Sequence, residues 1–110
     1  MRRSKYGVRT DKAGKEARTV DNICFHSKKE AKRYMELKLA QNVGLISELE
    51  LQPTFDLSVN GVLICRYRAD FRYRQDRKQV VEDAKGFKTP EYKLKKKLML
   101  AIHGIEIQEV

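Results

Sequence analysis

The sequence has little cysteine, little histidine and no long apolar segment. Its two cysteines, Cys24 and Cys65, lie far apart and match no zinc-binding spacing, so we expect both thiols to be reduced and buried, with a disulfide as the less favoured alternative. His26 and His103 are isolated, and we expect surface or capping positions for both. No apolar run approaches the ~20 residues of a membrane-spanning helix, and Met1-Arg2-Arg3 begins no visible signal peptide. These absences predict a cytoplasmic protein that does not enter membranes.

The charge of the chain is strongly one-sided. Its 110 residues include 24 Lys and Arg against 15 Asp and Glu, which gives a net charge of +9. This length predicts one domain with a real core, and the charge indicates a polyanionic partner, although basic ribosomal-type proteins have a similar balance. Residues 1–22 form a basic arm that we expect to be flexible, either as a solvated tail or as a segment that wraps a phosphate backbone. We place the folded domain at residues 23–110.

A capped helix is predicted to begin after Ser27. Ser27 and Glu30 form an S-x-x-E capping box, and helix-forming residues continue to Ala40. The inward side carries Ala31, Tyr34 and Leu37, and the solvated side carries Lys28, Lys29, Lys32, Arg33 and Glu36. Glu30 serves the cap, but it also leans toward the inward side, which leaves a second role open.

Two segments alternate between apolar and polar residues, as half-buried strands do. They are residues 48–59 and 62–74, and Pro53 favours an edge position or a bulge in the first. A two-residue turn at Asn60-Gly61 would set apolar residues of one strand beside polar residues of the other, so we predict a three-residue loop over 59–61. In this register Phe55 pairs with Cys65, Glu50 lies beside Asp70 and Gln52 lies beside Arg68, unless a bulge at Pro53 shifts the last two.

A third strand, over residues 80–85, is predicted to bring two acids together. If Asp76 and Arg77 form a two-residue hairpin turn, Asp70 falls opposite Asp83. Opposed residues share a face with Cβ atoms ~5 Å apart, and Lys85 takes the same face as Asp83 because strand side chains alternate. Two carboxylates this close repel each other unless a divalent cation lies between them. The alternative is a surface ladder of ion pairs between Asp70 and its neighbouring arginines.

The C-terminal part predicts a helix and a last strand. Thr89 caps the helix with Pro90 at its first position, and Gly104 ends it. The predicted buried stripe contains Leu94, Leu98, Ala101 and Ile102. Residues 105–107 then form a strand that runs parallel to the third strand across a helical crossover. The fold class is therefore α/β (α+β): a mixed sheet of about four strands in α-β-β-β-α-β order, with flanking helices.

The order of these acids resembles the PD-(D/E)XK nuclease superfamily. The matching positions are Glu30 on the first helix, Asp70 on a strand, and Asp83 with Lys85 on the next strand. The chain most resembles small phage-encoded proteins and, beyond them, Holliday-junction resolvases, through SKKEAKRY, ELQP, ADF and VEDAKG. Ala69 stands where the superfamily's name has proline. The resemblance implies a restriction-endonuclease-like core and a nuclease domain over residues 23–110.

The resemblance also implies a mechanism, which is metal-assisted phosphodiester hydrolysis. Asp70, Asp83 and the backbone carbonyl of Ala84 would ligate Mg²⁺ or Mn²⁺, and Glu30 would complete the ligand shell. Lys85 would orient the attacking water or stabilise charge. Gln52 is the weakest of the catalytic assignments.

The expected substrate is DNA, with branched DNA favoured because so short a chain carries no recognition insertion. Such cores often act as homodimers, and for a phage-encoded protein the place of action would be the host cytoplasm. The expected nucleic-acid contacts are Arg66, Arg68, Arg72, Lys88, Lys93, Lys96 and Lys97. Two alternatives remain open: a non-catalytic nucleic-acid-binding protein with the same fold, and a structural or regulatory phage protein with a protein partner.

Overall fold

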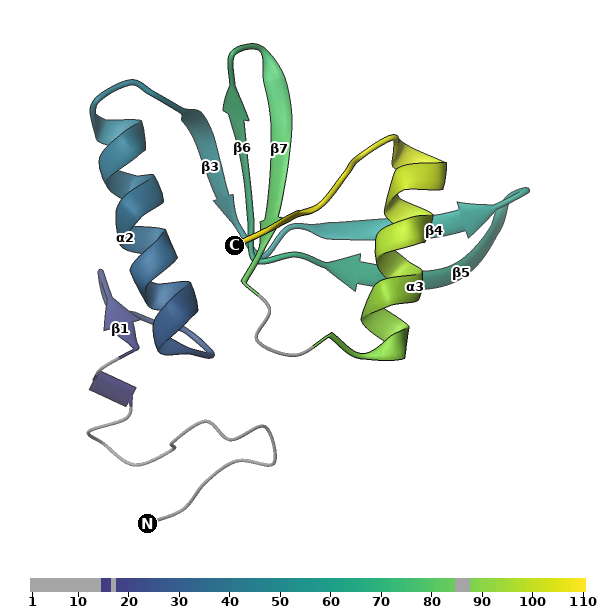
Figure 1. The fold of residues 1–110 in the computed structure, drawn as a ribbon, viewed down its shortest axis with the longest axis horizontal. Coiled ribbons are helices and arrows are strands. Elements are labelled where there is room, and N and C mark those ends of the chain that lie inside the picture. Colours follow the sequence, from purple (N-terminus) through teal and green to yellow (C-terminus); the bar gives the residue numbers. More distant parts are fainter. Residues whose placement is uncertain (1–14, 17, 85–87) are drawn as a thin grey trace.

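The computed structural model describes residues 15, 16, 18–84 and 88–110, and it has a mixed α and β architecture (Figure 1). The elements are β1 (Thr19–Val20), β2 (Ile23–Cys24), α2 (Lys28–Asn42), β3 (Ser47–Leu51), β4 (Thr54–Val59), β5 (Val62–Arg68), β6 (Phe71–Gln75), β7 (Lys78–Asp83), α3 (Pro90–Leu98), the π-helical turn η1 (Met99–His103) and β8 (Gln108–Glu109). None of the described helices has the length and apolar composition needed to span a membrane.

A four-stranded mixed sheet forms the centre of the fold, as the sequence predicts. Its strand order is β3-β6-β7-β8, and β8 runs parallel to β7 after the α3 crossover. The last strand was expected at residues 105–107 but lies at 108–109, and Ile107 is buried just before it. The predicted fold class and the parallel last strand are therefore confirmed, with a shift in the strand's position.

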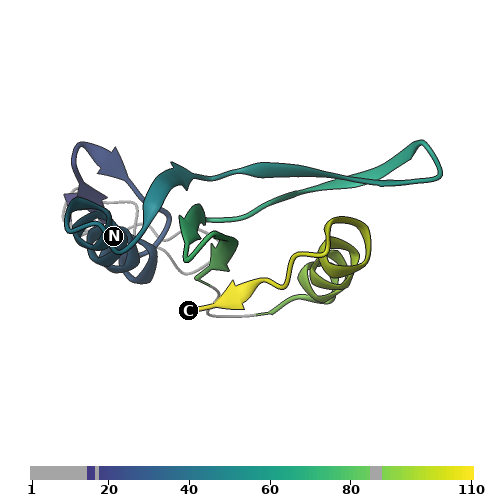
Figure 2. The same cartoon turned by 90° about the horizontal axis from the view of Figure 1, so that it is seen from above.

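The two long strands predicted before β7 are each divided. The first breaks at Gln52-Pro53 into β3 and β4, and the second breaks at Ala69-Asp70 into β5 and β6. The two breaks lie side by side and are joined by backbone hydrogen bonds. The Gln52 N–H donates to the Asp70 carbonyl at 2.9 Å, and the Ala69 N–H donates to the Pro53 carbonyl at 3.0 Å. Beyond this corner β4 and β5 leave the sheet as a separate ribbon, which Figure 2 shows reaching past α3.

The prediction of a three-residue loop between β4 and β5 is wrong. Asn60 and Gly61, at φ of 51° and 80°, form a two-residue turn, which sets Val59 opposite Val62. A bulge at Ile64 then exchanges the faces, because Ser58 pairs with Leu63 while Leu57 pairs with Cys65. The apolar faces agree as expected, but Phe55 lies opposite Tyr67 rather than Cys65.

The predicted turn between β6 and β7 is confirmed. Asp76 and Arg77 have φ of 52° and 66°, as a two-residue hairpin turn of the primed type requires. The ladder then sets Phe71 opposite Glu82. Because side chains alternate along a strand, Glu82 and Asp83 point to opposite faces of the sheet.

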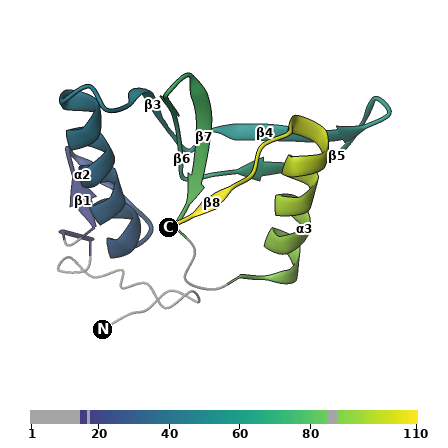
Figure 3. The same cartoon turned by 45° about the horizontal axis from the view of Figure 1, so that its top comes forward.

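Two hydrophobic cores lie on opposite faces of the β6–β7 hairpin. One contains Phe71 and Tyr73 and packs against α2, while the other contains Val81 and packs against α3 and the β4–β5 ribbon. Figure 3 shows α2 and α3 on either side of this hairpin. On α2, the predicted cap and buried face are confirmed: Ser27 accepts from the Glu30 N–H, and the buried apolar residues are Ala31, Tyr34 and Leu37.

Three local expectations need correction. On α3 the buried residue is Tyr92, followed by Met99 in η1; Leu94 and Ala101 are exposed, and Leu98 and Ile102 are only partly buried. Both cysteines are free thiols, but Cys24 is exposed and Cys65 is partly buried rather than fully buried. The predicted boundary at residue 22 falls inside the β1–β2 hairpin, and residues 1–14 and 17 of the predicted arm lie outside the described residues.

Candidate active site

Asp70 and Asp83 lie beside each other where the β6–β7 ladder ends. Asp70 occupies the bend between β5 and β6, and its N–H donates to the Glu82 carbonyl at 3.1 Å. Its Oδ2 accepts from the Ala84 N–H at 2.7 Å, one residue beyond Asp83 at the end of β7. The register predicted from the two-residue turn therefore holds as far as Phe71 and Glu82, and Asp70 then bonds to the residues on either side of Asp83.

The Asp83 carboxylate is almost completely buried on the α3 face of the sheet. It accepts a hydrogen bond from the Tyr67 hydroxyl. Burial and then this bond raise the pKa of Tyr67 far above its ordinary value. Burial, the Glu109 bond and the Asp83 charge likewise raise the pKa of Tyr92. Both tyrosines therefore stay protonated at neutral pH, and Tyr67 holds the orientation of Asp83.

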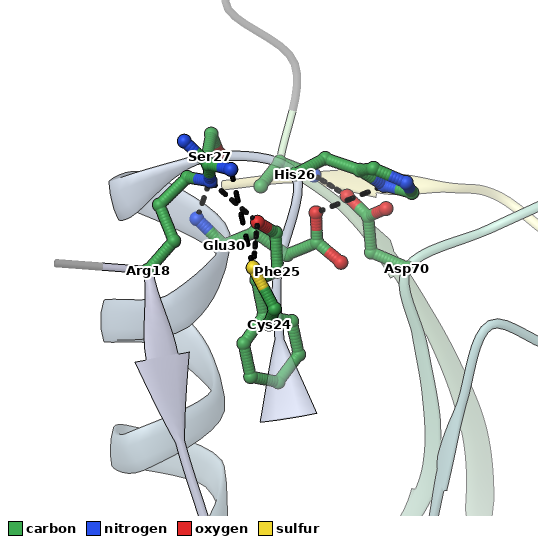
Figure 4. Close-up of polar contacts among 8 residues, drawn as sticks. Arg18, Cys24, Phe25, His26, Ser27, Glu30 and Asp70 are labelled. Atoms are coloured by element: carbon green, nitrogen blue, oxygen red, sulfur yellow. Dashed lines mark hydrogen bonds and ion pairs between the residues drawn. The ribbon is translucent and has the colours of Figure 1, made fainter. Parts of the chain in front are cut away.

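Glu30 reaches the same region from α2. It is buried in the first turn of the helix, where its N–H donates to Ser27 Oγ at 3.1 Å. Its Oε2 lies 3.8 Å from His26 Nδ1, and Figure 4 shows its carboxylate close to that of Asp70. Glu30 therefore lies beside Asp70 as well as in the helix cap, and its second role stays a prediction.

The sheet separates the acids that flank this site. Glu82 pairs with Phe71 and faces α2, whereas Asp83 takes the opposite face, toward Tyr67 and α3. Glu30 approaches from the α2 side, with Asp70 at the strand end between the two. Within residues 15, 16, 18–84 and 88–110, no three His, Cys, Asp or Glu side chains are gathered closely enough to hold a metal ion by themselves.

Two further predicted residues have different outcomes. Gln52 lies beside Asp70 through its backbone bond, rather than beside Arg68 as expected, and Glu50 pairs with Arg72 rather than lying beside Asp70. Lys85 lies outside the described residues, so its catalytic assignment stays a prediction.

Glu82, the acid before Asp83, is buried and fully engaged in hydrogen bonds. Its two carboxylate oxygens accept from Arg33 Nε at 2.7 Å and Arg33 Nη2 at 2.6 Å, and the Tyr73 hydroxyl also donates to it. The expectation that Arg33 belongs to a solvated face is therefore wrong, because its side chain is only 30 % exposed and bonded to a buried acid. Burial and the Glu82 bond raise the pKa of Tyr73 to about 12.

Most of the predicted nucleic-acid contacts already have acidic neighbours. Arg66 pairs with Asp56 at 2.9 Å, and Arg72 pairs with Glu50. Lys88 and Lys96 lie 3.0 and 3.2 Å from Glu109, whose pKa they and Tyr92 lower to about 2. The remaining predicted contacts, Arg68, Lys93 and Lys97, are exposed.

A groove runs between the β4–β5 ribbon and the first half of α3, with a volume of about 510 Å³. Its cationic side chains are Arg66, Arg68 and Lys95, and Lys95 also contacts Glu91 at 2.9 Å. Tyr67 and Tyr92 line the same groove, so it adjoins the buried Asp83. Lys95 was not among the predicted contacts, because a run of lysines on a short helix does not indicate which one faces a neighbouring ribbon.

A family model matches residues 3–107, and the family is described as "Protein of unknown function (DUF1064)". The match covers nearly the whole chain, which therefore belongs to this family. Comparisons with curated proteins and with solved structures gave no match. Nuclease membership therefore stays a prediction that rests on the acids and on the order of the elements.

Proposed function

We propose that this chain is a metal-dependent DNA endonuclease that hydrolyses phosphodiester bonds. The observation that carries the proposal is the pair Asp70 and Asp83, brought together at the end of the β6–β7 ladder with the Ala84 N–H bonded to Asp70. The order of α2, the strands up to β7, α3 and β8 along the chain supports the same interpretation, as does the position of Glu30 near Asp70.

The donor chemistry of this site suits a hard divalent cation such as Mg²⁺ or Mn²⁺. Asp70, Asp83 and the backbone carbonyl of Ala84 would hold the ion, and Glu30 would reach it through water or through a second ion. When bound, such a cation activates water and neutralises charge on the phosphate. These residues fit such an ion by donor type, since carboxylate and carbonyl oxygens are the ligands that Mg²⁺ and Mn²⁺ prefer.

The protein's own side chains would act around this centre. Lys85 follows Asp83 by two residues, and its point charge would orient the attacking water or stabilise the phosphate. Tyr67 would keep Asp83 in one orientation by hydrogen bonding. Gln52 would act only indirectly, through its backbone bond to Asp70.

The proposed substrate is branched or duplex DNA, bound through its phosphates. The net charge of +9 supports a polyanionic partner. The groove with Arg66, Arg68 and Lys95 offers cations beside Tyr67, which bonds to Asp83. Contacts of this kind read shape rather than sequence. We therefore propose a structure-selective enzyme of phage DNA recombination, repair or processing that acts as a homodimer, so that two copies present two sites to two strands.

Purified protein tests this proposal directly on four-way, flapped and linear duplex DNA, each with Mg²⁺, with Mn²⁺ and with a chelator. We expect nicking that requires the divalent cation and favours the branched substrates. Cation-dependent cutting of all three at equal rates would contradict the structural selectivity but retain the nuclease. Inertness on every substrate, together with tight binding, would contradict the nuclease itself.

The second candidate is a nucleic-acid-binding protein that keeps the fold without cleavage. It is favoured by the hydrogen bonds that Asp70 and Asp83 already accept from Ala84 and Tyr67, which resemble a purely structural network. The cleavage panel above discriminates the two, because a binder would show salt-dependent binding without any cation-dependent nicking.

A further inference from the structure

The loop before α2 places an imidazole beside the proposed site. His26 lies between β2 and the capping residue Ser27, and its Nδ1 is 3.8 Å from Glu30 Oε2. Figure 4 shows its ring next to the carboxylates of Glu30 and Asp70. Side chains from a loop, a helix and the bend before β6 therefore meet at one point.

The neighbours of His26 are anchored on both sides. Buried Arg18 donates from Nε to the Phe25 carbonyl at 2.8 Å, and the Phe25 N–H donates to the Arg18 carbonyl at 2.9 Å. The Phe25 ring is buried against Tyr34 with centroids 5.0 Å apart, and Ser27 caps α2. The backbone at His26 is thus held in place by its neighbours, although the His26 ring itself is mostly exposed and packs little against the core.

His26 and Glu30 differ sharply in how far their side chains are exposed to solvent. The His26 side chain is 70 % exposed, whereas that of Glu30 is 4 % exposed. A ring this exposed contributes little to packing, so its substitution should leave the stability of the fold nearly unchanged. The exposed ring beside Glu30 and Asp70 can therefore contact a ligand that binds there from solvent.

We propose that His26 is a substrate-contacting residue whose ring N–H donates to a non-bridging oxygen of a DNA phosphate bound at the proposed site, on the side of Glu30 and Asp70. Because Nδ1 faces Glu30, the donor to the phosphate is Nε2, in the tautomer that carries its proton there. The proposal rests on the proposed nuclease function. It adds a group that faces the phosphate from the α2 side, opposite the groove formed by β5 and α3.

Kinetics of the variants His26→Ala, His26→Gln and His103→Ala test this role. His103 is the matched control, because it is the other histidine, is exposed, and contacts the Asp56 carbonyl in β4 rather than the site. We expect His26→Ala to lose on the order of 10²-fold in kcat/KM, as removal of a donor to a reacting oxyanion does. His26→Gln should retain part of the activity through its amide N–H, and His103→Ala should match the wild type. A His26→Ala variant with wild-type kinetics would overturn the proposal, as would an unchanged maximal rate with a raised Mg²⁺ requirement, which would make His26 a metal ligand.

A second measurement does not depend on cleavage. The chain has only two histidines, so their imidazole NMR signals are assigned from the same variants. Addition of a short DNA duplex with Ca²⁺ should shift the His26 signals and leave those of His103 in place. If the His26 signals do not move while DNA binds, the inference fails even if the wild type is a nuclease. If they move but no cation supports cleavage, the proposed function fails and the phosphate contact stands.

Discussion

Arg33 on α2 holds Glu82 on β7 through two hydrogen bonds, from Nε to Oε1 at 2.7 Å and from Nη2 to Oε2 at 2.6 Å. Glu82 directly precedes Asp83, and Arg33 lies about one helical turn after Glu30. This pair therefore joins the helix that carries one proposed site acid to the strand that carries another. The Tyr73 hydroxyl completes the surroundings of the buried Glu82 carboxylate.

Removal of Arg33 should destabilise the fold strongly. Arg33→Ala leaves Glu82 buried without its cation, and loss of one partner of a buried ion pair costs about 3–5 kcal/mol. We expect the lower end of that range because Arg33 is partly exposed. Urea unfolding measures the loss, and the double variant Arg33→Met/Glu82→Gln should regain most of it.

Arg66→Ala is the control for this experiment. Arg66 and Asp56 form an ion pair in which both side chains are mostly exposed, and such pairs contribute about 0–1 kcal/mol. Equal losses in Arg33→Ala and Arg66→Ala would show that the Arg33 pair does not hold α2 to β7.

Glu109 should make stability depend on pH in the acid range. Lys88, Tyr92 and Lys96 lower its pKa from 4.5 to about 2 in the folded protein. Because the folded pKa is depressed, this contribution to stability is present above pH 4.5 and is lost as the pH falls toward 2. Glu109→Gln should therefore be less stable than the wild type above pH 4.5, with a gap in urea midpoints that narrows toward pH 2. A gap that stays constant over this range would contradict the assignment.

Sequence reasoning located the central elements because their signals are local. The capping residues Ser27 and Thr89 fixed two helix starts, and the Asp76-Arg77 turn fixed a register that pairs Phe71 with Glu82, next to Asp70 and Asp83. No bulge interrupts the pairing from Gln75–Lys78 to Phe71–Glu82, so simple counting from this turn reaches the residues next to the acids.

The remaining features depend on contacts that local patterns do not encode. Alternation continues unchanged through Pro53 and Asp70, so it cannot show that each strand leaves one sheet for another there. The bulge at Ile64 has no sequence signal of its own. The only hint is that a two-residue turn would set apolar residues of one strand beside polar residues of the other. The partner of Glu82 lies in α2, far back in the chain, and His26 is a single exposed residue without periodicity.

Arg68 should contribute to DNA binding through charge. It is exposed in the groove beside α3, and loss of one phosphate contact lowers the slope of log K against log salt by about 0.9. Arg68→Gln should lower the slope by this amount, and the double variant Arg68→Gln/Lys95→Gln should lower it by about twice as much. Binding is measured by fluorescence anisotropy over a salt series. Lys78→Gln, at the exposed start of β7, should leave the slope unchanged, and equal effects from both sites would indicate non-specific attraction without a groove.

The most direct test of the proposed catalytic centre is the variant Asp70→Asn, compared with Asp76→Asn in the β6–β7 turn. Asparagine keeps the size of Asp70 and an acceptor for the Ala84 N–H, so the fold and DNA binding should persist. At position 76 asparagine tolerates the positive φ, which makes Asp76→Asn a matched control with the same loss of charge. With four-way DNA and Mg²⁺, we predict that Asp70→Asn binds but does not cleave, whereas Asp76→Asn cleaves at the wild-type rate. Wild-type cleavage by Asp70→Asn would contradict the proposed metal site.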